Sequence, residues 1–185
     1  QGSAIDEQVN QIAQNFKSRL QLDTATGPQT YLLAIDPYQY LRRTENYLEK
    51  GHLGDELRDG EPYLTLNLAP VGRPVQMSFH VWIGAQWHKI YSFFRPGAEV
   101  INSFYWLPVI FSMLSVIPAF FIARKKAGLL GGFIAALLVA IHPYFISRTA
   151  AGFADTDAYN VFFPLLITWV FLEAFQAKTL RNKAI

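Results

Sequence analysis

The chain of 185 residues contains no cysteine, which excludes disulfides and thiolate metal sites within it. Charge is also scarce: Asp, Glu, Lys and Arg make up 16% of the residues, against roughly 25% in ordinary soluble domains. The net charge is +2 and no basic stripe alternates with stacking aromatics, so we expect no nucleic-acid partner. The chain has instead 51% hydrophobic and 15% aromatic residues. This composition favours a membrane protein.

The charged residues divide the chain into two regions. Most of them lie in residues 1–99, whereas residues 100–123 contain none. About 20 apolar residues are enough to cross a bilayer core. We therefore predict an external loop region over residues 1–99 and a transmembrane region over residues 100–185. The transmembrane region contains about three spans, at residues 100–123, 127–147 and 158–177.

Within the first region, three segments have the pattern of surface helices. Apolar residues over 5–22 recur at spacings of three and four, which predicts a helix with one apolar face. A second helix begins with Asp36 as its cap and Pro37 in its first turn, and Gly51 is its expected stop. A third helix, over residues 79–94, is rich in aromatic residues, which suits the headgroup region of a membrane.

The connecting segments of this region carry the residues of turns and loops. Residues 23–29 include Gly27-Pro28, which predicts a turn. Residues 52–76 contain several Gly and Pro, and we expect an ordered loop there with at most a short strand over residues 63–68.

Basic clusters at the ends of the apolar runs indicate the sidedness of the chain. Lys and Arg near span ends mark the cytoplasmic side. The clusters are Arg124 to Lys126 and the terminal Lys178, Arg181 and Lys183. Residues 1–99 and 148–157 should then both lie on the external face of a multi-pass protein of the cell membrane. Asp36, Asp155 and Asp157 can therefore meet.

These three acids have a structural and a functional interpretation. An Asp at the start of a helix caps free N–H groups and complements the helix dipole, and this alone would explain each of them. Their hard oxygen atoms also suit Mg²⁺ or Mn²⁺, and one oxygen can cap while the other binds metal. Arg148 could pair with the acids or with an anionic substrate.

The other ionisable residues of the apolar region and the histidines receive plainer interpretations. We expect the four histidines to take part in ordinary interfacial packing. Glu173 should lie within reach of headgroups or of the Lys178 ammonium group.

The acidic motifs resemble those of a known family. Arg148-Thr149, Gly152 and Asp155-Thr156-Asp157, together with Asp36-Pro37-Tyr38, are similar to motifs in the catalytic subunit of oligosaccharyltransferase, especially the archaeal single-subunit enzymes. The resemblance covers roughly residues 30–175. It implies an all-α, multi-span fold of the glycosyltransferase C type, with a long first external loop that carries amphipathic helices.

The same resemblance implies an activity and a set of site residues. The activity is transfer of an oligosaccharide from a dolichyl phosphate or pyrophosphate carrier to Asn of an Asn-x-Ser/Thr sequon. Asp36, Asp155 and Asp157 would hold Mn²⁺ or Mg²⁺, Asp36 would also contact the acceptor amide, and Arg148 would support the metal ligands. The partners are the lipid-linked oligosaccharide, the acceptor polypeptide and the membrane. The family's further Glu and its Trp-Trp-Asp sequon pocket lie downstream of Ile185, so we expect this segment alone to be inactive.

Two alternatives stay open at the level of the sequence. One is a polyprenyl-phosphate-dependent protein O-mannosyltransferase, which also keeps acids on its first external loop. The other is a membrane transporter or structural subunit, in which the acids only cap helices. Charged groups within the spans would favour the second alternative, and the three apolar runs contain almost none.

Overall fold

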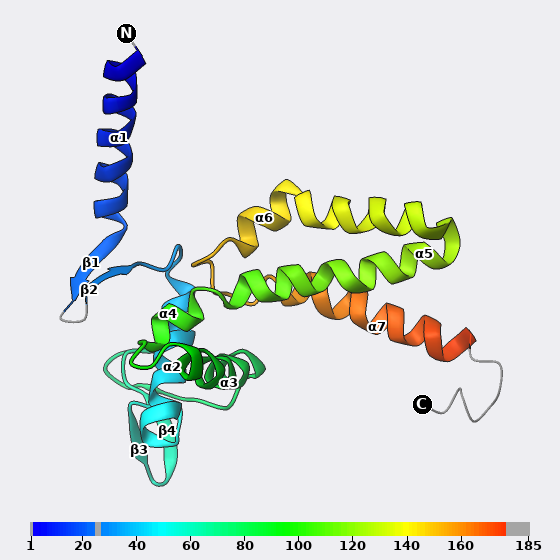
Figure 1. Ribbon diagram of the computed structural model, residues 1–185. Coiled ribbons are helices and arrows are strands. Elements are labelled where there is room, and N and C mark those ends of the chain that lie inside the picture. The colour runs from blue at the N-terminus through cyan, green and yellow to red at the C-terminus, as the bar shows by residue number, and fades with distance from the viewer. Residues whose placement is uncertain (1, 25–26, 177–185) are drawn as a thin grey trace.

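The computed structural model describes residues 2–24 and 27–176, and this part of the chain is mostly helical (Figure 1). The helices are α1 (Gly2–Arg19), α2 (Asp36–Lys50), α3 (Phe79–Phe94), α4 (Val100–Phe104), α5 (Leu107–Ile141), α6 (Pro143–Thr149) and α7 (Tyr159–Gln176). The strands are β1 (Gln21–Thr24), β2 (Gly27–Thr30), β3 (Glu56–Arg58), β4 (Glu61–Leu64) and β5 (Arg73–Pro74). The predicted helical fold is thus observed, with short strands added to it.

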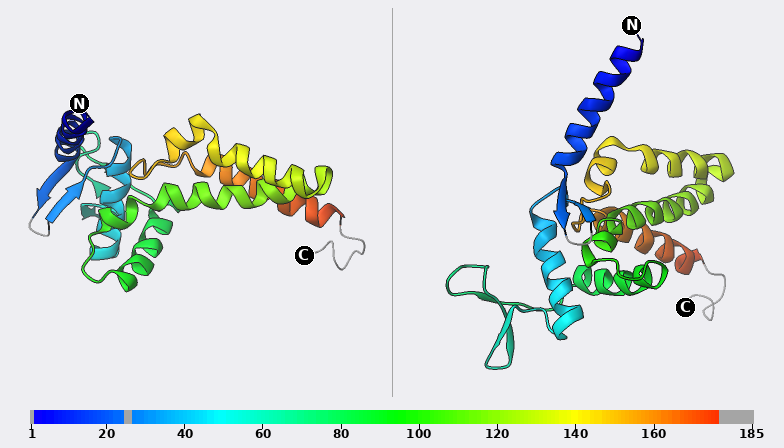
Figure 2. Two further views of the ribbon diagram at one scale, coloured as in Figure 1. Left: turned by 45° about the horizontal axis from the view of Figure 1, so that its top comes forward. Right: turned by 60° about the vertical axis from the view of Figure 1, so that its left-hand side comes forward.

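Helix α5 consists of two antiparallel arms, which Figures 1 and 2 show side by side with α7. The backbone leaves the helical conformation at Ala127 and Gly128, and the φ of Gly128 is +67°. Glycine adopts this conformation without the penalty that a Cβ atom brings. Within the described residues, two segments are long and apolar enough to cross a membrane, Val100–Ile141 and Tyr159–Gln176. The first of these includes both arms of α5.

The apolar runs are subdivided more finely than the sequence predicts. The run over residues 100–123 is interrupted between α4 and α5, and the run over residues 127–147 is interrupted at His142, before α6. Glu173 on α7 pairs with Lys125 at 2.7 Å, a partner that the sequence analysis did not name. Lys178, which it did name, lies outside the described part of the chain.

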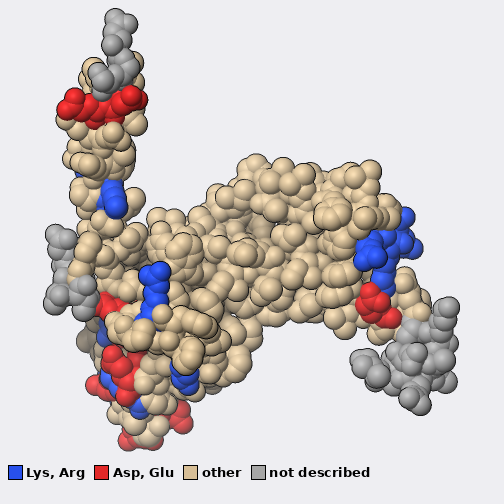
Figure 3. All heavy atoms as spheres, in the orientation of Figure 1, with Lys and Arg blue, Asp and Glu red and all other residues tan. Residues whose placement is uncertain are grey.

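Charged side chains gather at the two ends of the molecule, with an uncharged band over the α5 arms between them (Figure 3). At 1.5 Å per residue, the first arm over residues 107–126 is about 30 Å long, which matches the hydrocarbon core of a bilayer. Its far end carries Arg124, Lys125 and Lys126. The opposite end carries α2, α3, α4 and the segment with Asp155 and Asp157 (Figure 1).

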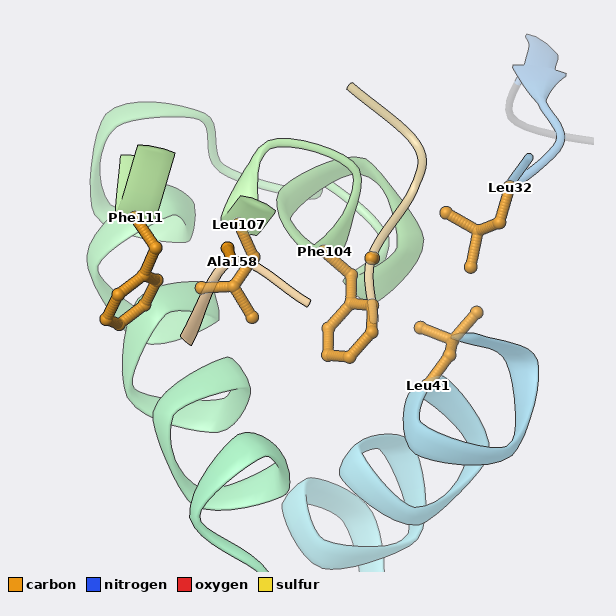
Figure 4. Close-up of a cluster of buried hydrophobic side chains, with 7 residues drawn as sticks. Leu32, Leu41, Phe104, Leu107, Phe111 and Ala158 are labelled. Carbon is orange, nitrogen blue, oxygen red and sulfur yellow. The ribbon is translucent and has the colours of Figure 1, made fainter. Parts of the chain in front are cut away.

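One hydrophobic core joins the segments at this opposite end. Figure 4 shows Phe104 of α4 among residues of α2, of α5 and of the segments that precede α2 and α7. The buried members are Leu32, Leu41, Phe104, Leu107, Phe111, Ala154 and Ala158. Since Leu32 precedes Asp36 and Ala154 precedes Asp155, the two acid-bearing segments are anchored in the same core.

The strands extend one prediction for the first region and correct another. The expected turn at residues 23–29 is part of a hairpin in which β1 pairs with β2, and residues 52–76 form an antiparallel sheet in the order β3-β4-β5. The strands of both sheets are too short to show a long alternation of apolar and polar residues. Their formation therefore depends on strand pairing and packing. Leu64 of β4 and Val81 of α3 share a second buried cluster, which holds the sheet against α3.

Three predicted helix ends are confirmed, whereas the start of α2 and the bounds of α1 differ from the prediction. Gly51 ends α2 with φ +76°, and α3 has the bounds predicted from its pattern. The helix predicted over residues 5–22 is α1, which begins at Gly2 and ends at Arg19, while residues 21 and 22 belong to β1. Asp36, however, is not the cap of α2. Ile35 takes the cap position with helical backbone angles, and Asp36 begins the helix itself.

Candidate functional site

Gly152 is the junction between the two acid-bearing segments. The Leu33 N–H donates to the Gly152 carbonyl at 2.9 Å, and the Gly152 N–H donates to the Tyr105 carbonyl at 2.8 Å. Gly152 is buried with φ +92°, and a Cβ atom there would lie 2.7 Å from Cε2 of Tyr105. Only glycine combines this backbone conformation with so close an approach. Three segments distant in sequence are thereby held together.

His80 of α3 ties the same segment to α7. Its Nε2 lies 3.2 Å from the Ala154 carbonyl and its Nδ1 lies 2.7 Å from the Tyr159 hydroxyl. A carbonyl only accepts, so Nε2 carries the proton, and Nδ1 accepts from Tyr159. Burial lowers the pKa of His80 from 6.5 to about 4, although the Ala154 hydrogen bond and the charge of Asp155 act in the opposite direction. The imidazole is therefore neutral at pH 7.

This role of His80 was missed by the sequence analysis, which expected interfacial packing. The side chain is 3% exposed and its ring contacts those of Tyr40, Phe104 and Tyr159 edge-on. Its partner Ala154 is 74 residues away in the chain. No local pattern indicates a partner at that separation.

Asp36 and Asp155 approach a common neighbour, Tyr40 of α2. Burial raises the pKa of Tyr40, the charges of Asp155 and Asp36 raise it further, and Arg43 lowers it. Both carboxylates therefore lie within electrostatic reach of this hydroxyl. Asp36 is exposed at the start of α2, whereas Asp155 is half-buried and accepts a hydrogen bond from the Thr156 N–H at 2.6 Å.

Asp157 faces Arg148, as the sequence analysis allowed. Nη1 of Arg148 lies 3.6 Å from Oδ2 of Asp157, and the two side chains are 47% and 34% exposed. An ion pair this exposed contributes roughly 0–1 kcal/mol to the free energy of unfolding. Its main effect is to orient the two side chains. The guanidinium also lies over the rings of Tyr144 and Phe153, at 5.7 and 5.4 Å from their centroids. Arg148 thus has one carboxylate and two aromatic rings as neighbours.

The chemistry of these acids fits a hard divalent cation, because carboxylate oxygens are the preferred ligands of Mg²⁺ and Mn²⁺. The described residues contain no group of three or more His, Asp or Glu close enough to hold a metal by themselves. Mg²⁺ does not require such a group, since it is usually held by one or two carboxylates with waters and substrate phosphate. In the structure, Asp36 and Asp155 both lie near Tyr40. Asp157 lies beside Arg148.

Asp55 shows what a purely structural carboxylate looks like in this fold. Its Oδ1 accepts from Arg42 and Asn46, and its Oδ2 accepts from the N–H and the hydroxyl of Thr65. Burial would raise the pKa of Asp55, but these hydrogen bonds lower it to about 2. By contrast, no hydrogen bond from a described residue reaches the Asp36 carboxylate. Among the described residues, the oxygen atoms of Asp55 are thus used by hydrogen bonds within the fold and those of Asp36 are not.

A cavity of about 500 Å³ opens beside Arg148 and Asp157, between the second arm of α5, α6 and α7. Most of its surface is apolar. It is lined by Leu138, Val139, His142, Tyr144, Phe145, Arg148, Asp157, Asn160 and Val161. The charged residues of the lining are Arg148 and its ion-pair partner Asp157, so the polar part of this apolar cavity can hold either an anionic group or a cation.

The fold and the site define a membrane protein that holds carboxylates and an arginine at one end of its apolar helices. The chain belongs to the oligosaccharyl transferase family: residues 9–184 match the family described as "Oligosaccharyl transferase STT3, N-terminal". This confirms the resemblance drawn from the acidic motifs.

Two curated relatives share the name dolichyl-phosphooligosaccharide-protein glycotransferase. The protein of Methanococcus voltae is 35% identical over 161 residues, which cover 82% of this chain and 17% of the relative. That of Methanocaldococcus jannaschii is 35% identical over 159 residues, covering 80% of this chain and 17% of the relative. The chain thus spans about a sixth of the length of these relatives. No solved structure matches it significantly.

The first prediction concerns the pH dependence of stability. Since the pKa of folded His80 is about 4, the unfolded chain binds a proton between pH 6.5 and 4 that the folded chain does not. Stability present above pH 6.5 should therefore fall as the pH drops toward 4, by roughly 3 kcal/mol at about 1.4 kcal/mol per pH unit. His80→Gln should flatten this part of the curve, measured by denaturation of the full-length protein. An unchanged slope would contradict the role of His80.

The second prediction concerns the junction. Gly152→Ala should lower the stability of the full-length protein by about 1–3 kcal/mol, because it adds both backbone strain and a clash with Tyr105. Gly97→Ala is the matched control, since Gly97 also has a positive φ, +82°, but open space around its Cβ position. Thermal unfolding should show the larger loss at Gly152. Equal losses would mean that the close approach does not matter.

Proposed function

We propose that this chain is the metal-binding part of an enzyme that transfers an oligosaccharide from a dolichyl phosphate or pyrophosphate carrier to Asn of an Asn-x-Ser/Thr sequon. The observation that supports this most directly is the hydrogen bond from Leu33 to Gly152. It joins the segment before Asp36 to the segment before Asp155, so acids from two distant loops are held near each other. The names of the two relatives support the reaction class.

Asp36, Asp155 and Asp157 are the proposed ligands of Mn²⁺ or Mg²⁺. The metal, when bound, would offset the charge that develops on the leaving phosphate. Asp36 has an exposed carboxylate without a hydrogen-bond partner among the described residues, so it is also the best placed to accept a hydrogen bond from the acceptor amide. Arg148 holds Asp157 in place through their ion pair.

The apolar cavity is the proposed site for the first isoprenoid units of the carrier. Its lining residues Val139 and Val161 belong to the apolar helices α5 and α7, while Arg148 lies on α6 and Asp157 lies between α6 and α7. A carrier phosphate near Arg148 would thus continue into an apolar tail along the second arm of α5. The proposed location of the reaction is the external face of the cell membrane.

The third prediction tests the free carboxylate. In the full-length protein with Mn²⁺, Asp36→Asn should lower glycan transfer to a sequon peptide roughly 100-fold or more, since the amide cannot replace a charged metal ligand. Glu49→Gln is the control, because Glu49 is an exposed acid on the same helix. Transfer by the Asp36 variant at the wild-type rate would refute the proposed role.

The fourth prediction tests the cavity. Val161→Phe should fill part of it and raise the KM for the lipid-linked donor severalfold, while the Mn²⁺ concentration for half-maximal rate stays unchanged. Ile167→Phe is the control, because it introduces the same side chain at a position of α7 that is 65% exposed. An effect of equal size at residue 167, or no effect at residue 161, would exclude the cavity as the carrier site.

A further inference from the structure

Helix α1 presents an apolar face that the rest of the described chain does not cover. Every described side chain of α1, over residues 4–19, is exposed. The large apolar ones are Ile5, Val9, Ile12 and Phe16, and Leu20 follows directly after the helix. At about 100° per residue they fall within an arc of roughly 80°, so they form one continuous stripe.

The polar residues of α1 are arranged around this stripe. Gln14 lies on the opposite side of the helix, whereas Lys17 and Arg19 flank the stripe on its two sides, by the same count of about 100° per residue. Long cationic side chains in flanking positions can keep their charge at the level of lipid phosphates while their stems stay in apolar surroundings. The two cations are balanced by Asp6 and Glu7, so α1 has no net charge.

The orientation of α1 relates this face to the membrane. Figures 1 and 2 show α1 running across the direction of the two α5 arms, at the end of the molecule that carries the candidate site. The arms follow the membrane normal if they span the bilayer. A helix that runs across them then lies parallel to the membrane plane, which is the orientation of interfacial amphipathic helices.

We infer that α1 is an interfacial helix whose apolar stripe binds the lipid surface of the external leaflet. Because α1 has no net charge, burial of the apolar stripe drives this binding, and anionic lipid is not required. The helix is connected to the site: the Tyr31 N–H donates to the Leu20 carbonyl at 2.9 Å, and β1 pairs with β2 in front of Leu33. Docking of α1 therefore sets the position of the Asp36 loop relative to the membrane.

The test uses single cysteines labelled with an environment-sensitive fluorophore. The described chain offers a clean background, since its sequence contains no cysteine. The full-length protein, with any cysteines outside this segment replaced, is reconstituted in phosphatidylcholine vesicles with brominated acyl chains. At Val9→Cys the bromolipid should quench the label severalfold more than at Gln14→Cys, and aqueous iodide should show the reverse order.

The outcomes separate lipid from the other possible surroundings of α1. Equal iodide quenching at both positions would mean that the stripe faces water, and protection of residue 9 from both quenchers would mean that protein covers it; either result overturns the inference. Ile12→Ser with Phe16→Ser should move the label at residue 9 into water. Asp36→Asn should leave the quenching pattern unchanged, so the result does not depend on the transfer reaction.

Discussion

The position of the acid-bearing segments depends on the pair of backbone hydrogen bonds at Gly152. The residue accepts from Leu33 and donates to Tyr105, and both groups would cost free energy if they were buried without partners. A side chain at this position would strike the Tyr105 ring, so the contact requires glycine. The core around Phe104 packs against both segments, and the buried His80 binds the segment that contains Ala154.

The surroundings of the acids separate structural from functional carboxylates better than their sequence context does. Asp55 accepts four hydrogen bonds, from Arg42, Asn46 and twice from Thr65, and serves to join α2 to the β-sheet. Asp36 begins a helix without acting as its cap, so its charge complements the helix dipole while its oxygen atoms are not used to cap N–H groups. This makes the proposed ligand role of Asp36 stronger than its helix-start pattern suggests.

Several features were predictable because their causes are local. The stop of α2 at Gly51 follows from a left-handed backbone angle, and the bounds of α3 follow from apolar spacing and Pro96-Gly97. The pairings β1–β2 and β3–β4–β5 were not predicted, because their short strands depend on partners rather than on pattern. The ties of His80 to Ala154 and Tyr159 join residues more than 70 positions apart, which no local spacing encodes.

By itself, the sequence determined the helical class, the apolar runs, the amphipathic face of α1 and the acidic motifs by which the family was correctly anticipated. These properties depend on composition and short-range periodicity, which are present in the chain before it folds. Only the tertiary structure decided which acids are saturated by hydrogen bonds, which histidine is buried and neutral, and how Gly152 brings the two loops together. These properties depend on contacts between distant segments, and such contacts exist only once the common core has formed.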